Sequence, residues 1–178
     1  SGLVGSEMCI RDRNVHSAKG HQLQSGITIM DPYTGNIVGM VGAMGPKTQN
    51  LVDNYAVQKH QVGSSIKPLT VYSAALDAGA VTPATTFDNY PVELMNNSPW
   101  PKNSPNTYTG WTMIGEGVRR SINTIAVQTV EALGVVDSYA YATEKLGLSL
   151  VPEDMAVSPL AMGGLTYGPV SYTHLTLP

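Results

Sequence analysis

The sequence predicts a globular domain of mixed α/β class, and three observations lead to this prediction. First, 42% of the 178 residues are hydrophobic and 13% are charged, which is typical of a chain that buries an apolar core. Second, two segments rich in Ile, Val, Met and Thr flank a short turn near the N-terminus, a pattern that favours a β-hairpin. Third, several later segments carry apolar residues at helical spacing and end at glycine.

The predicted hairpin pairs residues 25–31 with residues 36–44. The turn between them, residues 31–35, contains a proline that restricts φ and a glycine that adopts left-handed angles without strain. The polar residues 45–62 then connect the hairpin to the first predicted helix.

A serine and a lysine stand at the start of a helix predicted over residues 64–78 and ended by Gly79. Positions i and i+3 of a helix share a face, so Ser64 and Lys67 are expected to point the same way. Unpaired N–H groups and the helix dipole at this end favour an oxygen nucleophile and the oxyanion that forms on it. Burial beside this positive end disfavours an ammonium group, so Lys67 is a candidate base for Ser64. The same pattern also fits a plain helix cap followed by a solvated lysine.

A second motif favours the catalytic interpretation over the plain cap. Ser64 begins the only Ser-x-x-Lys of the chain, and Ser121-Ile122-Asn123 follows later. Ser-x-x-Lys followed by a motif of the Ser-x-Asn type resembles the pattern of penicillin-binding proteins and class A β-lactamases. A helix is expected to begin at the second motif and to end at Gly134. Its apolar face would consist of Ile122, Ala126, Thr129, Val130 and Leu133.

Residues 82–110 are predicted to form an ordered loop, and neither a helix nor a central strand, because prolines interrupt them repeatedly. These prolines are Pro83, Pro91, Pro99, Pro101 and Pro105. The loop contains a second Ser-x-Asn match at residues 104–106, which is interpreted as accidental because its middle residue is proline and no helix follows. Three aromatic side chains are interpreted as packing residues, although they could also line a peptide groove. They are Trp100, Tyr108 and Trp111.

Two further helices are expected towards the C-terminus. Asp137 is expected to cap a helix over residues 137–145, which a glycine ends. Ser158 is expected to cap a further helix, with Pro159 as its first residue, and the helix is expected to continue over residues 160–167.

Several segments together resemble one protein family. Residues 57–76 resemble the segment around the active serine of bifunctional (class A) penicillin-binding proteins. Residues 100–103 (Trp-Pro-Lys-Asn) and 108–110 (Tyr-Thr-Gly) resemble the approach to the second motif of that family. The resemblance extends over residues 24–168, about the first half of a transpeptidase domain, and departs at His60, where many relatives carry arginine.

The resemblance implies the fold of penicillin-binding proteins and β-lactamases, of the α/β (α+β) class, with an antiparallel sheet and a helical subdomain. It also implies a role for each residue of the two motifs. Ser64 would be the acylated nucleophile and Lys67 the base. Ser121 would relay a proton, and Asn123 would contact Lys67 and the substrate amide. The predicted hairpin would be scaffold rather than site.

The third motif of the family, Lys-Ser/Thr-Gly, occurs nowhere in the sequence. Residues 14–169 are therefore expected to be a partial transpeptidase domain, truncated before the strand that carries this motif. Expressed alone, this part is expected neither to fold cooperatively nor to react with penicillin, because a sheet edge would be uncovered and one oxyanion donor missing. Residues 1–13 and 170–178 resemble translated sequencing-adapter sequence and are expected to lie outside the domain.

The function that the resemblance implies is that of a peptidoglycan D,D-transpeptidase. Such an enzyme crosslinks stem peptides ending in D-Ala-D-Ala by serine acyl transfer, and β-lactams acylate the same serine. The parent protein would be anchored at the outer face of the bacterial cytoplasmic membrane, with a glycosyltransferase domain upstream and without a cofactor.

Other functions stay open at this point. A β-lactam sensor or a catalytically silent wall-binding domain would use the same cleft for recognition only. A serine β-lactamase is disfavoured, because residues 93–97, which loosely resemble the surroundings of its deacylating glutamate, precede Ser121 instead of following it.

Charge and composition argue against further classes of protein. A net charge of −3 and a pI of about 5.7, with Lys and Arg scattered, argue against a nucleic-acid partner. No apolar run reaches the roughly 18 to 20 residues of a membrane span. The lone Cys9 cannot form an internal disulfide, and no metal is expected because the four histidines lack companion ligands at metal spacing. These histidines are His16, His21, His60 and His174.

Overall fold

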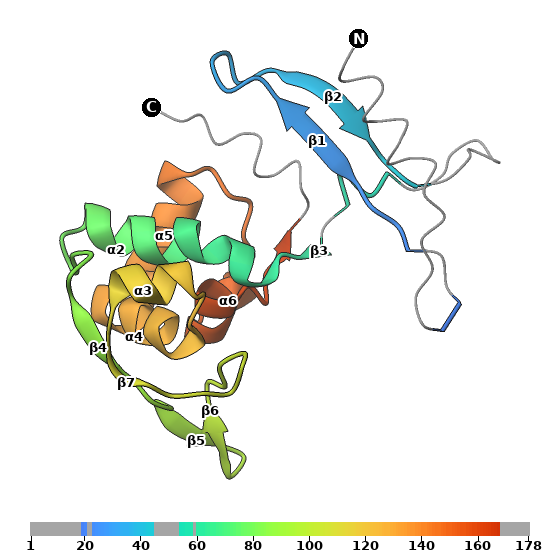
Figure 1. Ribbon diagram of the computed structural model, residues 1–178. Helices are drawn as coiled ribbons and strands as arrows, with labels where there is room; N and C mark the ends of the chain where they lie inside the picture. Colours follow the sequence, from blue (N-terminus) through green and yellow to red (C-terminus); the bar gives the residue numbers. More distant parts are fainter. Residues whose placement is uncertain (1–18, 21–22, 45–53, 59, 168–178) are drawn as a thin grey trace. The chain divides into compact units, whose positions relative to one another are not determined.

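The computed structural model contains both strands and helices, so the predicted mixed α/β class is confirmed (Figure 1). The residues that it describes are 19–20, 23–44, 54–58 and 60–167. The chain divides into two compact units. These are Ser1–His60 together with Tyr167–Pro178, and Gln61–Thr166. The termini predicted to lie outside the domain, residues 1–13 and 170–178, lie outside the described residues.

A β-hairpin forms most of the described part of the first unit. Strand β1 (Ile27–Met30) pairs antiparallel with β2 (Ile37–Val41), which confirms the predicted hairpin (Figure 1). In the turn, Asp31 Oδ1 accepts a 2.9 Å hydrogen bond from the backbone N–H of Tyr33. Gly35 adopts a φ of +70°, in the region that glycine occupies without strain. The aspartate and the glycine therefore shape this turn.

A cluster of helices forms the core of the second unit, with α4 (Asn123–Leu133) in the middle. Residues on several sides of α4 are fully buried, among them Ile125, Ala126 and Val127. The helix ends at Gly134, which confirms the prediction for the segment after the second motif. The other helices of the unit pack around α4 (Figure 1). They are α2 (Ala74–Asp77), α3 (Ile114–Arg119), α5 (Val135–Ala140) and α6 (Val157–Met162).

Helix α3 has no counterpart among the sequence-based predictions. Its six residues include two glycines, which lower helix propensity. One of them, Gly117, lies so close to α4 that a Cβ there would be 2.5 Å from Cγ2 of Ile125. The glycine that weakens the helical pattern is therefore the residue that lets the two helices approach.

The helix predicted over residues 64–78 is present, but it is built from three kinds of turn. A 3-10 turn (Gly63–Ile66) comes first, a π-helical segment (Pro68–Ser73) follows, and α2 completes the run before Gly79. Proline lacks an N–H, and in an α-helix its ring clashes with the carbonyl one turn earlier. Tighter and wider turns around Pro68 remove this conflict.

The prediction that residues 82–110 form only a loop is wrong in part. Strand β4 (Thr86–Asn89) pairs antiparallel with β7 (Gly110–Met113). Strand β5 (Glu93–Met95) pairs in the same way with β6 (Ser98–Trp100). Among the described residues each of these ladders has two strands, so every strand in them is an edge strand, where proline is tolerated.

The turn between β5 and β6 contains a sequence signal for a hairpin, although prolines flank it. Asn96 and Asn97 have φ values of +51° and +59°, which are typical of a two-residue type I′ turn. Asparagine adopts such angles more readily than most residues. The Asn-Asn pair is therefore a hairpin signal within a proline-rich segment.

Two predicted helix starts need correction. Helix α5 begins at Val135 with Gly134 as its cap residue, so Asp137 lies inside the first turn and is not the cap. A carboxylate in this turn still interacts favourably with the helix dipole. The helix continues as a π-helical turn, Tyr141–Lys145, and reaches the predicted end.

Helix α6 begins at Val157, so Ser158 and Pro159 are its second and third residues, not its cap and first residue. It ends at Gly163, earlier than predicted, because this glycine adopts a left-handed φ of +78°. Two short strands cross the sequence boundaries of the two units, and a 3-10 turn precedes α6. These are β3 (His60–Gln61), β8 (Thr166–Tyr167) and the turn Pro152–Asp154. Across the described part of the chain, no helix has the length and apolar character needed to cross a bilayer.

Candidate active site

Ser64 and Lys67 are one helical turn apart but lie in different surroundings. Ser64 is exposed in the 3-10 turn, and Lys67, directly after that turn, is 2% exposed. The neighbouring Ser65 Oγ donates a 2.7 Å hydrogen bond to the carbonyl of Val62. By contrast, the hydroxyl of Ser64 makes no hydrogen bond to any described residue, the Lys67 amine included. Of the two serines, Ser64 therefore has the hydroxyl that is free to react.

The buried amine of Lys67 donates three hydrogen bonds, all to the second motif. The acceptors are Ser121 O at 2.8 Å, Ser121 Oγ at 3.2 Å and Asn123 Oδ1 at 2.6 Å. None of the three is a carboxylate, and burial lowers the pKa of Lys67 from 10.5 to about 8. A group with such a pKa changes protonation close to neutral pH, as a general base must.

Ser121 follows the C-terminal end of α3 in a left-handed conformation, with a φ of +54°. Its N–H donates to Val118 O at 3.1 Å, and the N–H of Ile122 donates to Gly117 O at 2.9 Å. This pair of bonds defines a Schellman motif, in which glycine is usual. An L-residue with a side chain is strained there by about 1–2 kcal/mol. The turn brings both the carbonyl and the hydroxyl of Ser121 to the lysine.

Asn123, the first residue of α4, is held from two directions. Its Oδ1 accepts the hydrogen bond from Lys67, and its Nδ2 donates a 2.7 Å bond to the carbonyl of Lys102. Its backbone N–H donates to Asn103 Oδ1 at 3.0 Å. The orientation of this amide therefore depends on the loop before β7 as well as on the lysine.

The turn that carries Ser64 packs against the end of α6. The N–H of Gly63 donates a 3.1 Å hydrogen bond to the carbonyl of Gly163. A Cβ on Gly163 would lie 1.8 Å from Gly63 O, so this approach requires glycine. Thr70 Oγ1 donates to Leu160 O at 2.6 Å and forms a second link to α6. Helix α6 thus fixes the position of the serine turn.

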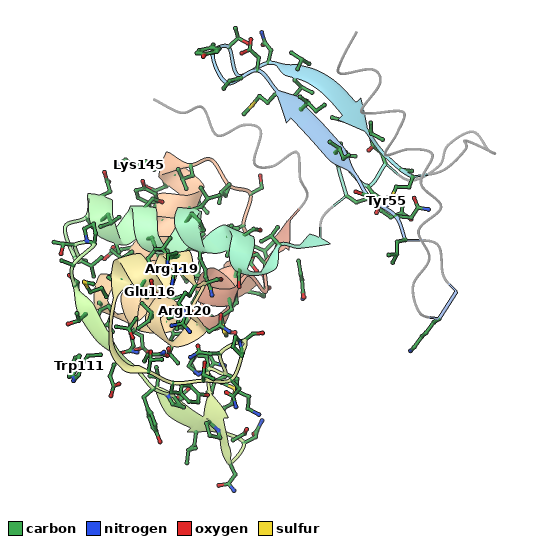
Figure 2. All side chains as sticks on the ribbon, in the orientation of Figure 1. Tyr55, Trp111, Glu116, Arg119, Arg120 and Lys145 are labelled. Carbon is green, nitrogen blue, oxygen red and sulfur yellow. The ribbon has the colours of Figure 1, made fainter. Side chains whose placement is uncertain are left out.

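Figure 2 labels the charged groups at the end of α3, of which Arg119 is exposed and Glu116 partly exposed. Arg119 and Glu116 form an ion pair with 2.6 Å between Nη2 and Oε1. The hydrogen bond from Arg119 lowers the pKa of Glu116. Exposed pairs of this kind contribute little to stability because water screens them.

The aromatic side chains of residues 100–111 differ in their surroundings. Trp100 packs against the hydrophobic core, as predicted. Trp111 is 78% exposed and extends away from the helices, so its interpretation as a packing residue is wrong (Figure 2). On a two-stranded ladder one face stays open to solvent, and the side chain of Trp111 lies on that face. The ring of Tyr108 lies 5.7 Å from that of Tyr90.

The structure brings three of the four predicted site residues, Lys67, Ser121 and Asn123, into direct contact. Ser64 lies one helical turn before the lysine, without a hydrogen bond to it. Ser104, from the second Ser-x-Asn match, is exposed and is not a partner of Lys67.

Asn103 accepts a hydrogen bond from the backbone N–H of Asn123, and the sequence predicts no role for Asn103 beyond its place in the family resemblance. The available signal is indirect. The residue before α4 is Ile122, which has no side-chain oxygen to cap a helix, so the cap has to come from elsewhere in the chain.

Comparison with known proteins gives a consistent picture. Residues 25–154 match the family described as "Penicillin binding protein transpeptidase domain". Penicillin-binding protein 1A of Clostridium botulinum is 36% identical over 155 residues, which are 82% of this chain and 19% of that protein. Penicillin-binding protein 1A of Vibrio cholerae is 36% identical over 143 residues, 77% of this chain and 17% of that protein.

Solved structures agree with the sequence comparisons. The crystal structure of penicillin-binding protein 1A from Haemophilus influenzae matches with a TM-score of 0.70 and 25% identity. The match covers 88% of this chain and 24% of that one, and it confirms the predicted fold. The chain spans about a fifth of the length of the curated relatives that it matches. The matched residues 25–154 include both motifs, and the chain belongs to the penicillin-binding protein transpeptidase domain family.

Proposed function

We propose that this chain is part of a serine D,D-transpeptidase that crosslinks peptidoglycan stem peptides. The observation that carries the proposal is the buried amine of Lys67, hydrogen-bonded to Ser121 and Asn123 beside the exposed Ser64. A lysine whose pKa is about 8 can accept a proton near neutral pH. A serine that is exposed, and whose hydroxyl makes no hydrogen bond to a described residue, can reach a carbonyl carbon. Family membership supports the substrate class that we propose, a peptide that ends in D-Ala-D-Ala.

Acylation begins when the neutral amine of Lys67 takes the proton of Ser64 Oγ as this oxygen attacks the carbonyl carbon of the penultimate D-alanine. A bond forms between Oγ and the carbon, and the peptide C–N bond breaks. The leaving nitrogen receives a proton from Ser121 Oγ, which lies 3.2 Å from Lys67 Nζ and regains a proton from the lysine. The terminal D-alanine departs with the proton from Ser121, and the proton that Lys67 took from Ser64 is balanced by the one that the lysine gives to Ser121.

Deacylation reverses these proton transfers. The amine of a neighbouring stem peptide attacks the acyl carbon and gives a proton to Ser121 Oγ, which passes a proton to Lys67. The ester bond to Ser64 breaks, Lys67 returns a proton to Oγ, and the new amide is the crosslink. A β-lactam acylates the same oxygen by opening of its ring amide.

We also propose where the parent protein acts in the cell. Stem peptides lie outside the bacterial cytoplasmic membrane, so the parent protein acts at its outer face, anchored there and with a glycosyltransferase domain upstream, as in class A relatives. The proposed reaction uses side chains alone and requires no cofactor.

Labelling with a fluorescent penicillin tests the proposal. Because the chain spans only part of its relatives, we would graft residues 25–166 into the corresponding segment of Clostridium botulinum penicillin-binding protein 1A, and we call the product the chimera. The chimera is expected to label, Ser64→Ala to abolish labelling, and Ser65→Ala to retain most of it. A chimera that unfolds cooperatively but does not label, or that still labels in the Ser64→Ala variant, would contradict the proposal.

A thioester substrate separates the transpeptidase from a sensor or a silent wall-binding domain. Continuous turnover that increases with an added amine acceptor marks an acyltransferase. A single burst of product equal to the enzyme concentration marks a sensor and would contradict the proposal. Turnover that ignores the acceptor amine marks hydrolysis, as in a β-lactamase, and would contradict it too.

A further inference from the structure

Helix α4, which provides Asn123 to the site, begins without a cap of its own. The N-cap residue is Ile122, whose side chain cannot accept a hydrogen bond. The N–H groups of the first two helical residues instead donate to Asn103 Oδ1, from Asn123 at 3.0 Å and from Thr124 at 3.2 Å. A side chain twenty residues away in sequence thus does what a serine or aspartate at position 122 would do.

The amide of Asn103 is itself held in place. Its Nδ2 donates to Asn89 Oδ1 at 2.8 Å and to the carbonyl of Thr107 at 3.0 Å. Two bonds accepted and two donated use the full capacity of an asparagine side chain. The side chain therefore has one orientation in which all its groups are satisfied.

Asn89 connects the side chain of Asn103 to the β4–β7 ladder. It is 1% exposed at the end of β4, and its Nδ2 donates to Thr109 Oγ1 at 2.8 Å. Its Oδ1 also accepts a 2.6 Å bond from Thr124 Oγ1, in the first turn of α4. The cap on α4 is therefore anchored in a buried residue of a strand.

Lys102, the residue before Asn103, also holds Asn123 in place. The carbonyl of Lys102 accepts the bond from Asn123 Nδ2, which leaves Oδ1 of that amide directed at the amine of Lys67. Lys102 and Asn103 together hold Asn123 by its backbone and by its side chain. Any displacement of the pair changes where the acceptor for the lysine lies.

We propose that Asn103 is a positioning residue for acyl transfer: as the N-cap of α4 supplied from a distant loop, it orients Asn123 and, through Asn123, the amine of Lys67. This inference rests on the proposed function. Among the described residues, the side chain of Asn103 forms no hydrogen bond with Lys67, Ser64 or Ser121.

The test uses the chimera and measures two quantities in a penicillin reaction, the rate constant of acylation and the fraction of protein labelled at completion. Asn103→Ala is expected to lower the rate constant about 10- to 100-fold, the range for small displacements of a catalytic group, while the labelled fraction stays close to that of the parent. Asn106→Ala is the matched control, because this asparagine of the same loop is exposed and, among the described residues, its side chain bonds only with Tyr108. Its rate constant is expected to stay within about twofold of the parent, as for surface substitutions.

A purely structural role gives a different pattern. It would lower the labelled fraction of Asn103→Ala while the protein that remains folded reacts at the parental rate, and this result would overturn the inference. If Asn103→Ala does not fold, Asn103→Asp decides. Its carboxylate can still accept from α4, but it has no donors for the oxygens of Asn89 and Thr107, so the cap is displaced and Asn123 with it. A reduced rate constant in folded Asn103→Asp supports the inference, and a parental one overturns it. Failure of the proposed function appears separately, as an unlabelled but folded parent chimera.

Discussion

Asn123 Oδ1 accepts a 2.6 Å hydrogen bond from Lys67 Nζ, although the two residues are 56 positions apart in sequence. Through this contact the first turn of the serine helix meets the first turn of α4. Because Lys67 is also bonded to Ser121, one buried amine joins both motifs.

Lys67→Arg is expected to be nearly as damaging to penicillin acylation as Lys67→Ala. A guanidinium keeps its proton at any relevant pH, so it cannot take one from Ser64. The acylation rate constants of the two chimera variants, measured beside the parent, check this. If Lys67→Arg reacted at close to the parental rate, the lysine would supply only a positive charge, and the base would have to be another group.

The acylation rate is expected to rise with pH and to level off above about 8, because burial lowers the pKa of Lys67 to about 8. Below that value the amine is protonated and cannot act as a base. The rate should therefore fall about tenfold for each pH unit well below the pKa. Stopped-flow measurements over this range in the chimera test the sign, and a rate that is flat or falls with rising pH would be inconsistent with a lysine base.

Ser121→Gly is expected to slow acylation without loss of stability. Ser121 occupies a left-handed position where glycine is usual, so relief of strain of about 1–2 kcal/mol offsets the greater flexibility of glycine in the unfolded chain. Ser121→Ala removes the same hydroxyl but keeps the strain, and should melt at a lower temperature than Ser121→Gly. Thermal unfolding and labelling rates of both variants provide the comparison. Parental acylation in either variant would show that the hydroxyl relays no proton.

Gly163→Ala is expected to destabilise the chimera by about 1–3 kcal/mol and to slow labelling of Ser64, since overpacking forces the backbone to shift. The added Cβ would lie 1.8 Å from Gly63 O, in the turn that holds the serine. Gly164→Ala is the control, because its Cβ would meet Pro159 Cα at an ordinary 3.7 Å. Denaturant unfolding and labelling rates measure both effects. Equal behaviour of the two alanine variants would mean that α6 does not position the turn.

The parts of the fold that follow local rules were predictable from the sequence. The hairpin at residues 31–35 depends on an aspartate, a proline and a glycine that shape their own turn. The end of α4 at Gly134 likewise needs no partner outside the helix. The two motifs could be recognised because the spacing within each motif is local: three positions separate Ser64 from Lys67, and two separate Ser121 from Asn123.

Features that depend on distant partners could not be predicted in this way. The cap on α4 comes from Asn103, and no residue close to Ile122 in sequence indicates that Asn103 provides it. The close approach of Gly117 to Ile125 makes a glycine useful inside a helix, where propensity alone argues against it. Pro68 likewise changes the turn type without ending the helix, because neighbouring turns can tighten or widen.

The most direct test of the central claim locates the penicillin adduct by mass spectrometry of the labelled chimera. Fragmentation of the peptide that contains residues 60–102 distinguishes Ser64 from Ser65 and from the other serines of that peptide. The adduct is expected on Ser64 Oγ, one per molecule, and its formation should be lost when Lys67 is replaced. An adduct on Ser65, or on Ser64 at an undiminished rate without Lys67, would contradict the assignment of nucleophile and base.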